Sequence, residues 1–136
     1  MSSKAVRDAF EAAFAILVPA IPLQDTDNEE PDRSTLPESW ATTDYVGYGE
    51  QRMSLGTVAC RRETGTITVV VFVKAGTGSD QALTLAESIR TAFRDWKDST
   101  GNISITEVVP AETGEASSGR WFAAAVNLNY NFDIYI

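Results

Sequence analysis

The chain has 136 residues, 43% of them hydrophobic, and a net charge of −8. This length fits one domain, so we expect a single domain over residues 1–136 with a core of ordinary size. There is no histidine and only one cysteine, Cys60. That removes the commonest general base and zinc ligand, and it excludes an internal disulfide or a cysteine-cluster metal site. We therefore expect neither a metal nor a cofactor.

The acidic balance also limits the partners. Binding DNA as a ligand needs clustered Lys and Arg, which a net charge of −8 opposes. No stretch approaches the ~18 consecutive apolar residues of a membrane span. The N-terminus lacks the compact apolar block of a secretory signal. We expect a protein that is made in a cytoplasm and has no membrane partner.

The N-terminal segment predicts an amphipathic helix, because its apolar residues recur three and four positions apart and form one stripe. The stripe consists of Val6, Ala9, Phe10, Ala13, Phe14 and Leu17. Pro19 and Pro22 end the helix, since proline cannot continue it. Ile21 and Leu23 favour a short edge strand.

Residues 24–39 predict a mobile acidic loop, because six carboxylates face one arginine and two prolines interrupt the run. The alternating Asp25, Asp27 and Glu29 suggest a calcium loop. That loop needs glycine at its sixth position and a bidentate Glu at its twelfth. Glu30 and Leu36 stand there instead, so we reject the metal site.

Order resumes at Trp40, and residues 40–57 favour a strand interrupted by Gly47 and Gly49. Residues 58–74 predict a hairpin with its turn at Thr64-Gly65. Arg52, Arg61 and Arg62 are expected to be exposed on these strands.

Residues 66–74 predict a central strand that is apolar on both faces, which is typical of a strand covered on each side. One face carries Ile67, Val69, Val71 and Val73, and the other carries Val70 and Phe72. A glycine turn then leads into a helix with a stripe of Ala82, Leu85, Ala86, Ile89 and Phe93. The turn is not a phosphate-binding loop, because Lys74 precedes the glycines and Gln81 stands where a dinucleotide fingerprint needs its third glycine.

The C-terminal third predicts a strand over residues 103–109, a mobile loop over 111–119 and a long strand over 120–136. The last run alternates apolar residues with Asn127, Asn129, Asn131 and Asp133. At about 3.3 Å per residue it would be some 50 Å long. That exceeds the usual strand length of about five or six residues. The run therefore contains a bend or bulge, or its far end pairs with a neighbouring molecule.

No catalytic constellation is present. No serine lies in a GxSxG context, a Ser-His-Asp triad is impossible without histidine, and Cys60 has no histidine to activate it. We therefore expect a protein that is not an enzyme.

The order of these parts resembles the tail-terminator (tail-completion) proteins of long-tailed bacteriophages and prophages. The resemblance lies in QRMSLGT, in GTITVVVFVKAGTG and in the helix ALTLAESIRTAF. It implies an α+β subunit, with a twisted, mostly antiparallel sheet and two main helices packed against it. Such subunits form a hexameric ring that caps the tail tube, ends its polymerisation and offers a surface for head attachment.

The implied partners are other copies of the chain, the tail tube protein and a head-completion or neck protein, at the head–tail junction of the virion. DNA only passes through the lumen, which acidic residues would keep non-adhesive. Polar residues on the strands are the interface candidates, namely Arg52, Arg61, Arg62, Asn129, Asn131 and Asp133. The alternatives are another neck or tail component, such as a tube protein or head–tail connector, and a small-molecule-binding α+β domain.

Overall fold

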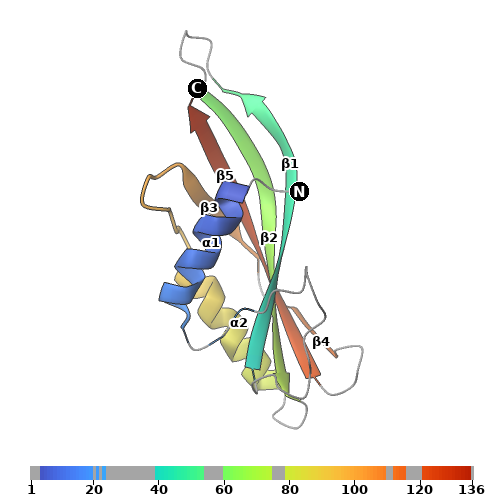
Figure 1. Ribbon diagram of the computed structural model, residues 1–136. Coiled ribbons are helices and arrows are strands. Elements are labelled where there is room, and N and C mark those ends of the chain that lie inside the picture. Colours follow the sequence, from blue (N-terminus) through green and yellow to red (C-terminus); the bar gives the residue numbers. More distant parts are fainter. Residues whose placement is uncertain are drawn as a thin grey trace.

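The computed structural model describes residues 4–19, 21, 23, 39–53, 60–74, 79–109, 112–115 and 121–135. Two helices and five strands follow one another along the chain (Figure 1). They are α1 (Lys4–Leu17), β1 (Ser39–Arg52), β2 (Cys60–Lys74), α2 (Ser79–Phe93), β3 (Ile103–Val108), β4 (Glu112–Glu115) and β5 (Trp121–Tyr135).

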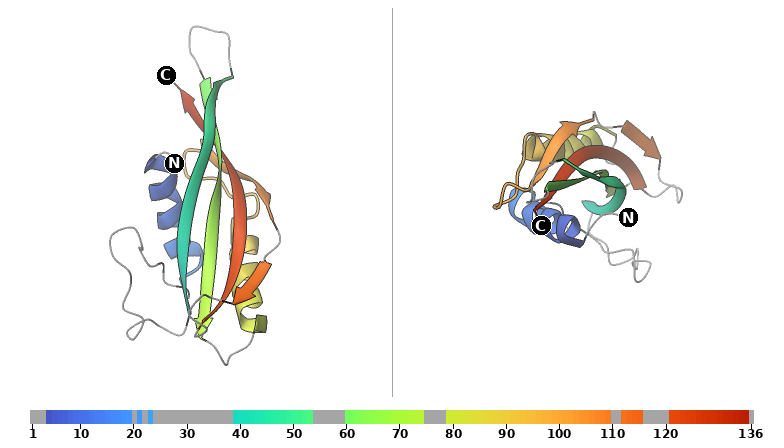
Figure 2. Two further views of the ribbon diagram at one scale, coloured as in Figure 1. Left: turned by 90° about the vertical axis from the view of Figure 1, so that its right-hand side faces the viewer. Right: turned by 90° about the horizontal axis from the view of Figure 1, so that it is seen from above.

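The strands form one antiparallel sheet in the order β1-β2-β5-β3, with β4 paired to β5. Figure 2 shows that this sheet is long and strongly twisted, with both helices on one of its faces. The expected fold class, α+β with two main helices on a twisted antiparallel sheet, is confirmed. The strands β1 and β3 are the opposite edges of the sheet along this path.

Helix α1 buries the face that its sequence predicts. Val6, Phe10 and Phe14 are buried in the core. The prediction for Leu17, the last member of the expected stripe, is wrong, because this residue is 44% exposed. Val18 takes the core position instead, and its N–H still donates to Phe14 O at 2.9 Å just before the proline ends the helix.

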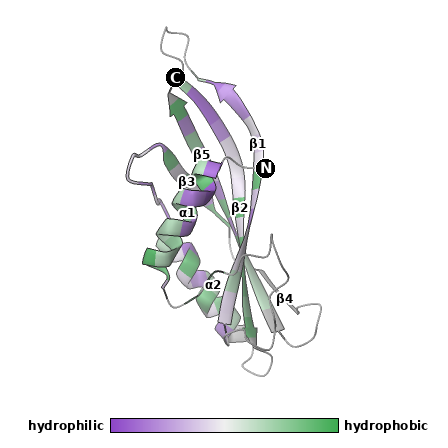
Figure 3. Ribbon diagram, in the orientation of Figure 1, coloured by the Kyte–Doolittle hydropathy of each residue, from purple (hydrophilic) through white to green (hydrophobic). Residues whose placement is uncertain are grey.

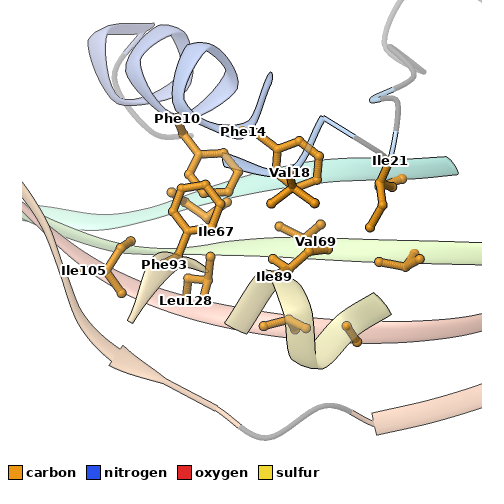
Figure 4. Close-up of a cluster of buried hydrophobic side chains, with 14 of the residues drawn as sticks. Phe10, Phe14, Val18, Ile21, Ile67, Val69, Ile89, Phe93, Ile105 and Leu128 are labelled. Atoms are coloured by element: carbon orange, nitrogen blue, oxygen red, sulfur yellow. The ribbon is translucent and has the colours of Figure 1, made fainter. Parts of the chain in front are cut away.

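Helix α2 buries Ala82, Ala86 and Ile89 together with Phe93, as its stripe predicts. The rings of Phe10 and Phe93 lie 4.6 Å apart between their centroids, so the two helices meet over the sheet in an aromatic cluster (Figure 4). Aromatic side chains contribute large apolar areas to a core, and tilted rings at this distance attract each other.

Strand β2 runs without a break from Cys60 to Lys74, so the hairpin turn predicted at Thr64-Gly65 is wrong. Gly65 is needed for a different reason. A Cβ at this position would overlap Val46 O and would lie 2.6 Å from Tyr130 Oη. The glycine therefore permits a close approach inside the sheet.

The antiparallel partner of β2 in the hairpin is β1, which pairs with it from Ser39↔Val73 to Arg52↔Arg61. The register shifts between Gly47 and Gly49, which is a β-bulge. The two glycines that suggested an interruption thus mark a local irregularity within one strand of 14 residues.

Strand β5 confirms the long alternating pattern, with 15 residues. It pairs with β2 along its whole length, from Lys74↔Trp121 to Cys60↔Tyr135. The end of β5 therefore belongs to its own sheet on the β2 side. On its other side, the pairing with β3 reaches only Phe132.

Two smaller expectations are wrong. Residues 112–115, which were expected in a loop, form β4 and pair with residues 122–125 of β5. The expected edge strand near Ile21 is only an isolated bridge between Leu23 and Ala41, although Ile21 itself is buried.

The two faces of β2, both of which were expected to be covered, are covered unequally among the described residues: Trp40, on the side away from the helices, is buried, whereas Val70 and Phe72 are only half-buried. The helices cover Ile67, Val69 and Val71. On the opposite face, Phe72 is only half-buried and stacks on Trp40, with 4.3 Å between ring centroids. The predicted acidic loop at 24–39, apart from Ser39, and the glycine turn at 75–78 lie outside the described residues.

Candidate functional site

The candidate functional surface is the face of the sheet that points away from the helices, called here the outer face. Side chains alternate along a strand, so the register of β2 and β5 with the buried Ile67 and Leu128 defines this face. It carries a double row of polar residues, namely Arg62, Thr64, Thr66 and Thr68 on β2 and Asn127, Asn129, Asn131 and Asp133 on β5.

The polar side chains of the outer face bond to one another across the strands. Thr66 Oγ1 donates to Asn129 Oδ1 at 2.7 Å, and Thr68 Oγ1 donates to Asn127 Oδ1 at 2.8 Å. Each pair occupies directly opposite positions in the sheet register, where cross-strand contacts stabilise a sheet most.

One row of these bonds crosses four strands of the sheet. The Tyr48 hydroxyl on β1 lies 2.9 Å from Thr66 Oγ1, and Asn129 Nδ2 donates to Glu107 Oε2 on β3 at 3.4 Å. Together with the Thr66–Asn129 bond, this row joins β1, β2, β5 and β3. The outer face therefore satisfies much of its own hydrogen-bonding capacity, which makes it a fixed surface.

An ion pair closes the far end of the double row. Arg62 Nε donates to Asp133 Oδ1 at 2.6 Å, and Arg62 Nη2 donates to Asp133 Oδ2 at 3.1 Å. Two parallel bonds from a guanidinium to one carboxylate give both strength and a defined geometry. The pair is half-buried, with side-chain exposures of 37% and 20%.

The structure separates the six predicted interface residues into two sets. Arg62, Asn129, Asn131 and Asp133 come together on the outer face, which sequence alternation alone could suggest for β5. Arg52 and Arg61 lie opposite each other on the other face of the sheet. There, Arg61 Nε forms an ion pair with Glu50 Oε1. The sequence could not assign these faces because, with a turn at Thr64-Gly65, residues 60–63 have no defined register against β5.

The upper ends of β1, β2 and β5 form a sheet extension, defined here as residues 48–53, 60–64 and 131–135, which reaches beyond helix α1 (Figures 1 and 2). Hydrophilic residues gather on its β1 and β2 strands (Figure 3). Large apolar side chains are nevertheless exposed at this end of β1, with Tyr48 at 70% and Met53 at 51%. The sequence pattern did not identify them as surface residues.

Two features of the described residues bear on catalysis. The described residues contain no group of three Cys, Asp or Glu side chains that could hold a metal ion. Burial raises the pKa of Tyr45 to about 12, so this hydroxyl is a poor base near neutral pH. Neither described helix is long and apolar enough to cross a membrane.

Comparisons with known proteins identify a family for this chain. A family model described as phage tail terminator protein matches residues 5–130. Among solved structures, 22 chains match. One of them covers 100% of this chain and 99% of its own length, with a TM-score of 0.65 and 18% identity. At that identity the likeness concerns the fold alone. None of the curated protein sequences matches.

Proposed function

Because the chain belongs to the phage tail terminator family and is therefore a structural component of a phage tail, we propose that it forms a hexameric ring capping the tail tube. The ring ends tube polymerisation and offers the surface to which the head attaches. It works at the head–tail junction of the virion, between the tail tube protein and a head-completion or neck protein. Its role is structural, without catalysis.

The observation that supports a ring most directly is the exposed edge of the sheet at β1. This strand pairs with β2 on one side, and its other side has only the single bridge from Leu23 among the described residues. Val46 and Tyr48 are exposed along it, at 41% and 70%, and Met53 is exposed just after its end, at 51%. A long edge strand with apolar side chains invites association unless a partner covers it. Neighbouring subunits in a closed ring would supply that cover.

DNA is proposed only to pass through the lumen of the ring. The net charge of −8 supports this, because an acidic channel repels the phosphate backbone. On the outer face, the one described arginine, Arg62, is held by Asp133. Mapping the charged side chains on a structure of the assembled ring tests the idea, and a lumen lined by unpaired Lys and Arg would contradict it.

The ring itself is tested by measuring the mass of the purified protein by light scattering, followed by negative-stain imaging. Six copies of 14.8 kDa give about 89 kDa, which is well separated from a monomer. Closed rings of one size support a terminator, whereas tubes of variable length would identify a tube protein instead.

Capping is tested by adding the protein to tail tube protein during polymerisation. We expect elongation to stop and each tube end to carry one ring. Tubes that grow equally long with and without the protein would contradict a terminating role.

A further inference from the structure

We propose that neighbouring copies in the ring overlap at two unlike surfaces, with the β1 edge of one copy on the corner between α2 and β3 of the next. Asp44 of one copy then faces Arg94 of the other, and Lys97 lies near the row that ends at Gly49. This inference rests on the proposed ring and names the surfaces that would build it.

The corner between α2 and β3 carries two unpaired cations. Arg94 and Lys97 follow the end of α2, both are exposed, and neither has an acidic partner within the described part of the chain. The backbone of Lys97 bridges to Ser104 on β3. Arg94 lines a small pocket with Thr106 and Val108. Asp95 and Glu107 line the same pocket, but neither forms an ion pair with Arg94 among the described residues. Both cations therefore lie at the β3 edge of the sheet.

The β1 edge carries the complementary features. Asp44 is exposed, and its Oδ1 accepts only the N–H of its own neighbour Tyr45, at 3.1 Å, among the described residues. The exposed Val46 and Tyr48 follow it on the same strand. Other exposed charges, by contrast, are paired within one subunit, as Arg61 is with Glu50.

The two surfaces lie in the same rows of the sheet. Val108 pairs with Leu128, Leu128 with Ile67, and Ile67 with Tyr45. These paired residues form one row across the sheet. The row begins at Val108, which lines the pocket with Arg94, and ends at Tyr45, which follows Asp44 in the chain.

The row beside Lys97 runs from Ser104 through Asn131 and Thr64 to Gly49. A ring is generated by rotation without a rise. In the proposed ring the strands run along the ring axis, so that residues in one row of a subunit meet the same row of the next.

The contact is an overlap of side chains and not the addition of a strand, because the outer edge of β3 is already occupied. Ile105 N donates to Trp96 O at 2.9 Å, and Asp98 N donates to Ile103 O at 3.0 Å. In addition, Asp44 lies on the outer face opposite Thr68, whereas Arg94 ends a helix on the other face. Unlike patches on opposite edges and faces give the heterologous contact that closes a ring.

Two charge-reversal variants test the interface. Asp44→Lys places like charges at the contact, and so does Arg94→Glu combined with Lys97→Glu. Each variant alone is expected to lower the fraction of protein in rings at least tenfold by light scattering. Asp8→Lys, an exposed reversal on α1, serves as the control and should leave that fraction unchanged. Thermal unfolding of each monomer verifies that it is folded.

Mixing gives the decisive result. In an alternating ring of the two variants, every contact again joins a cation to a carboxylate, and an even number of subunits allows perfect alternation. We expect rings to reappear near a 1:1 ratio, and also in the triple variant. If both charge-reversal variants still form rings as the wild type does, this interface is overturned but the ring is not. The same holds if the folded variants form no rings when they are mixed. A wild-type protein that stays monomeric, alone and on tube ends, would overturn both.

Discussion

Replacing Gly65 by alanine tests the close packing inside the sheet. The new Cβ would overlap Val46 O and would lie 2.6 Å from Tyr130 Oη and 2.7 Å from Tyr130 Cε1. Such overpacking costs about 1–3 kcal/mol. If the ring of Tyr130 moves, its hydroxyl also loses the 2.7 Å bond that it donates to the buried carboxylate of Glu63. A hydrogen bond to a charged group contributes ~1.5–3 kcal/mol. We expect Gly65→Ala to lower the free energy of unfolding by about 3 kcal/mol.

The assay is equilibrium unfolding in urea at one fixed protein concentration, because assembly adds to apparent stability. With a slope of about 2 kcal/mol per molar urea, the midpoint should fall by about 1.5 M. Thr64→Ala is the matched control. Thr64 is exposed, and its replacement should change stability by less than ~0.5 kcal/mol.

Tyr130→Phe added to Gly65→Ala tests the contact itself, since it removes the hydroxyl that crowds the new methyl group. The double variant should lose less than the sum of the two single losses. A Gly65→Ala protein as stable as the wild type, or stabilised by the ~0.4–1 kcal/mol that a compatible Gly→Ala change gives, would refute the close approach.

Two further predictions concern the charges and the pH response. A double-mutant cycle of Arg62→Ala and Asp133→Ala should give a coupling energy of about 1 kcal/mol, which falls in high salt because the pair is only half-buried; zero coupling at low salt would contradict it. Burial raises the folded-state pKa of Tyr45 to about 12 from its ordinary value of 10.0. The neutral phenol therefore stabilises the fold fully below pH 10, and this contribution is lost as the pH rises towards 12. The urea midpoint should thus fall more between pH 10 and pH 12 in the wild type than in Tyr45→Phe, and equal falls would show that Tyr45 is not responsible.

Periodicity predicted the elements whose burial is one-sided. The stripe of α2 and the alternation of β5 determine the faces that they bury, because only one arrangement of each hides its apolar residues. The same reasoning failed at Leu17 and Val18. A stripe defines a helix face but not the residue at which the chain leaves the helix and turns back into the core.

Glycine caused the main error in topology. Thr64-Gly65 is a pattern typical of a turn. In the structure, glycine is needed there because Val46 and Tyr130, which are distant in sequence, leave no room for a Cβ. Local sequence cannot reveal such a contact. Arg61 and Arg62 point to opposite faces because side chains alternate along a strand. Only the continuous β2 aligns Arg62 with Asp133 on β5, so the interface candidates could not be sorted from the sequence. The exposed charges Asp44, Arg94 and Lys97 also escaped notice, because being unpaired is a property of the folded subunit.

The pairing of β2 with β5 has a consequence for how the subunit matures. It joins residues from Lys74 and Trp121, 47 positions apart, to Cys60 and Tyr135, 75 positions apart. Sheets dominated by such distant pairs fold slowly, because a long loop must close before any contact forms. The strand between β2 and β3 is also the last of the five to be synthesised. Until β5 is in place, the hairpin of β1 and β2 is not joined to β3. The two edges of the sheet, β1 and β3, therefore reach their final positions only after β5 has paired with both β2 and β3. We thus expect the proposed ring to form only after the subunit has folded.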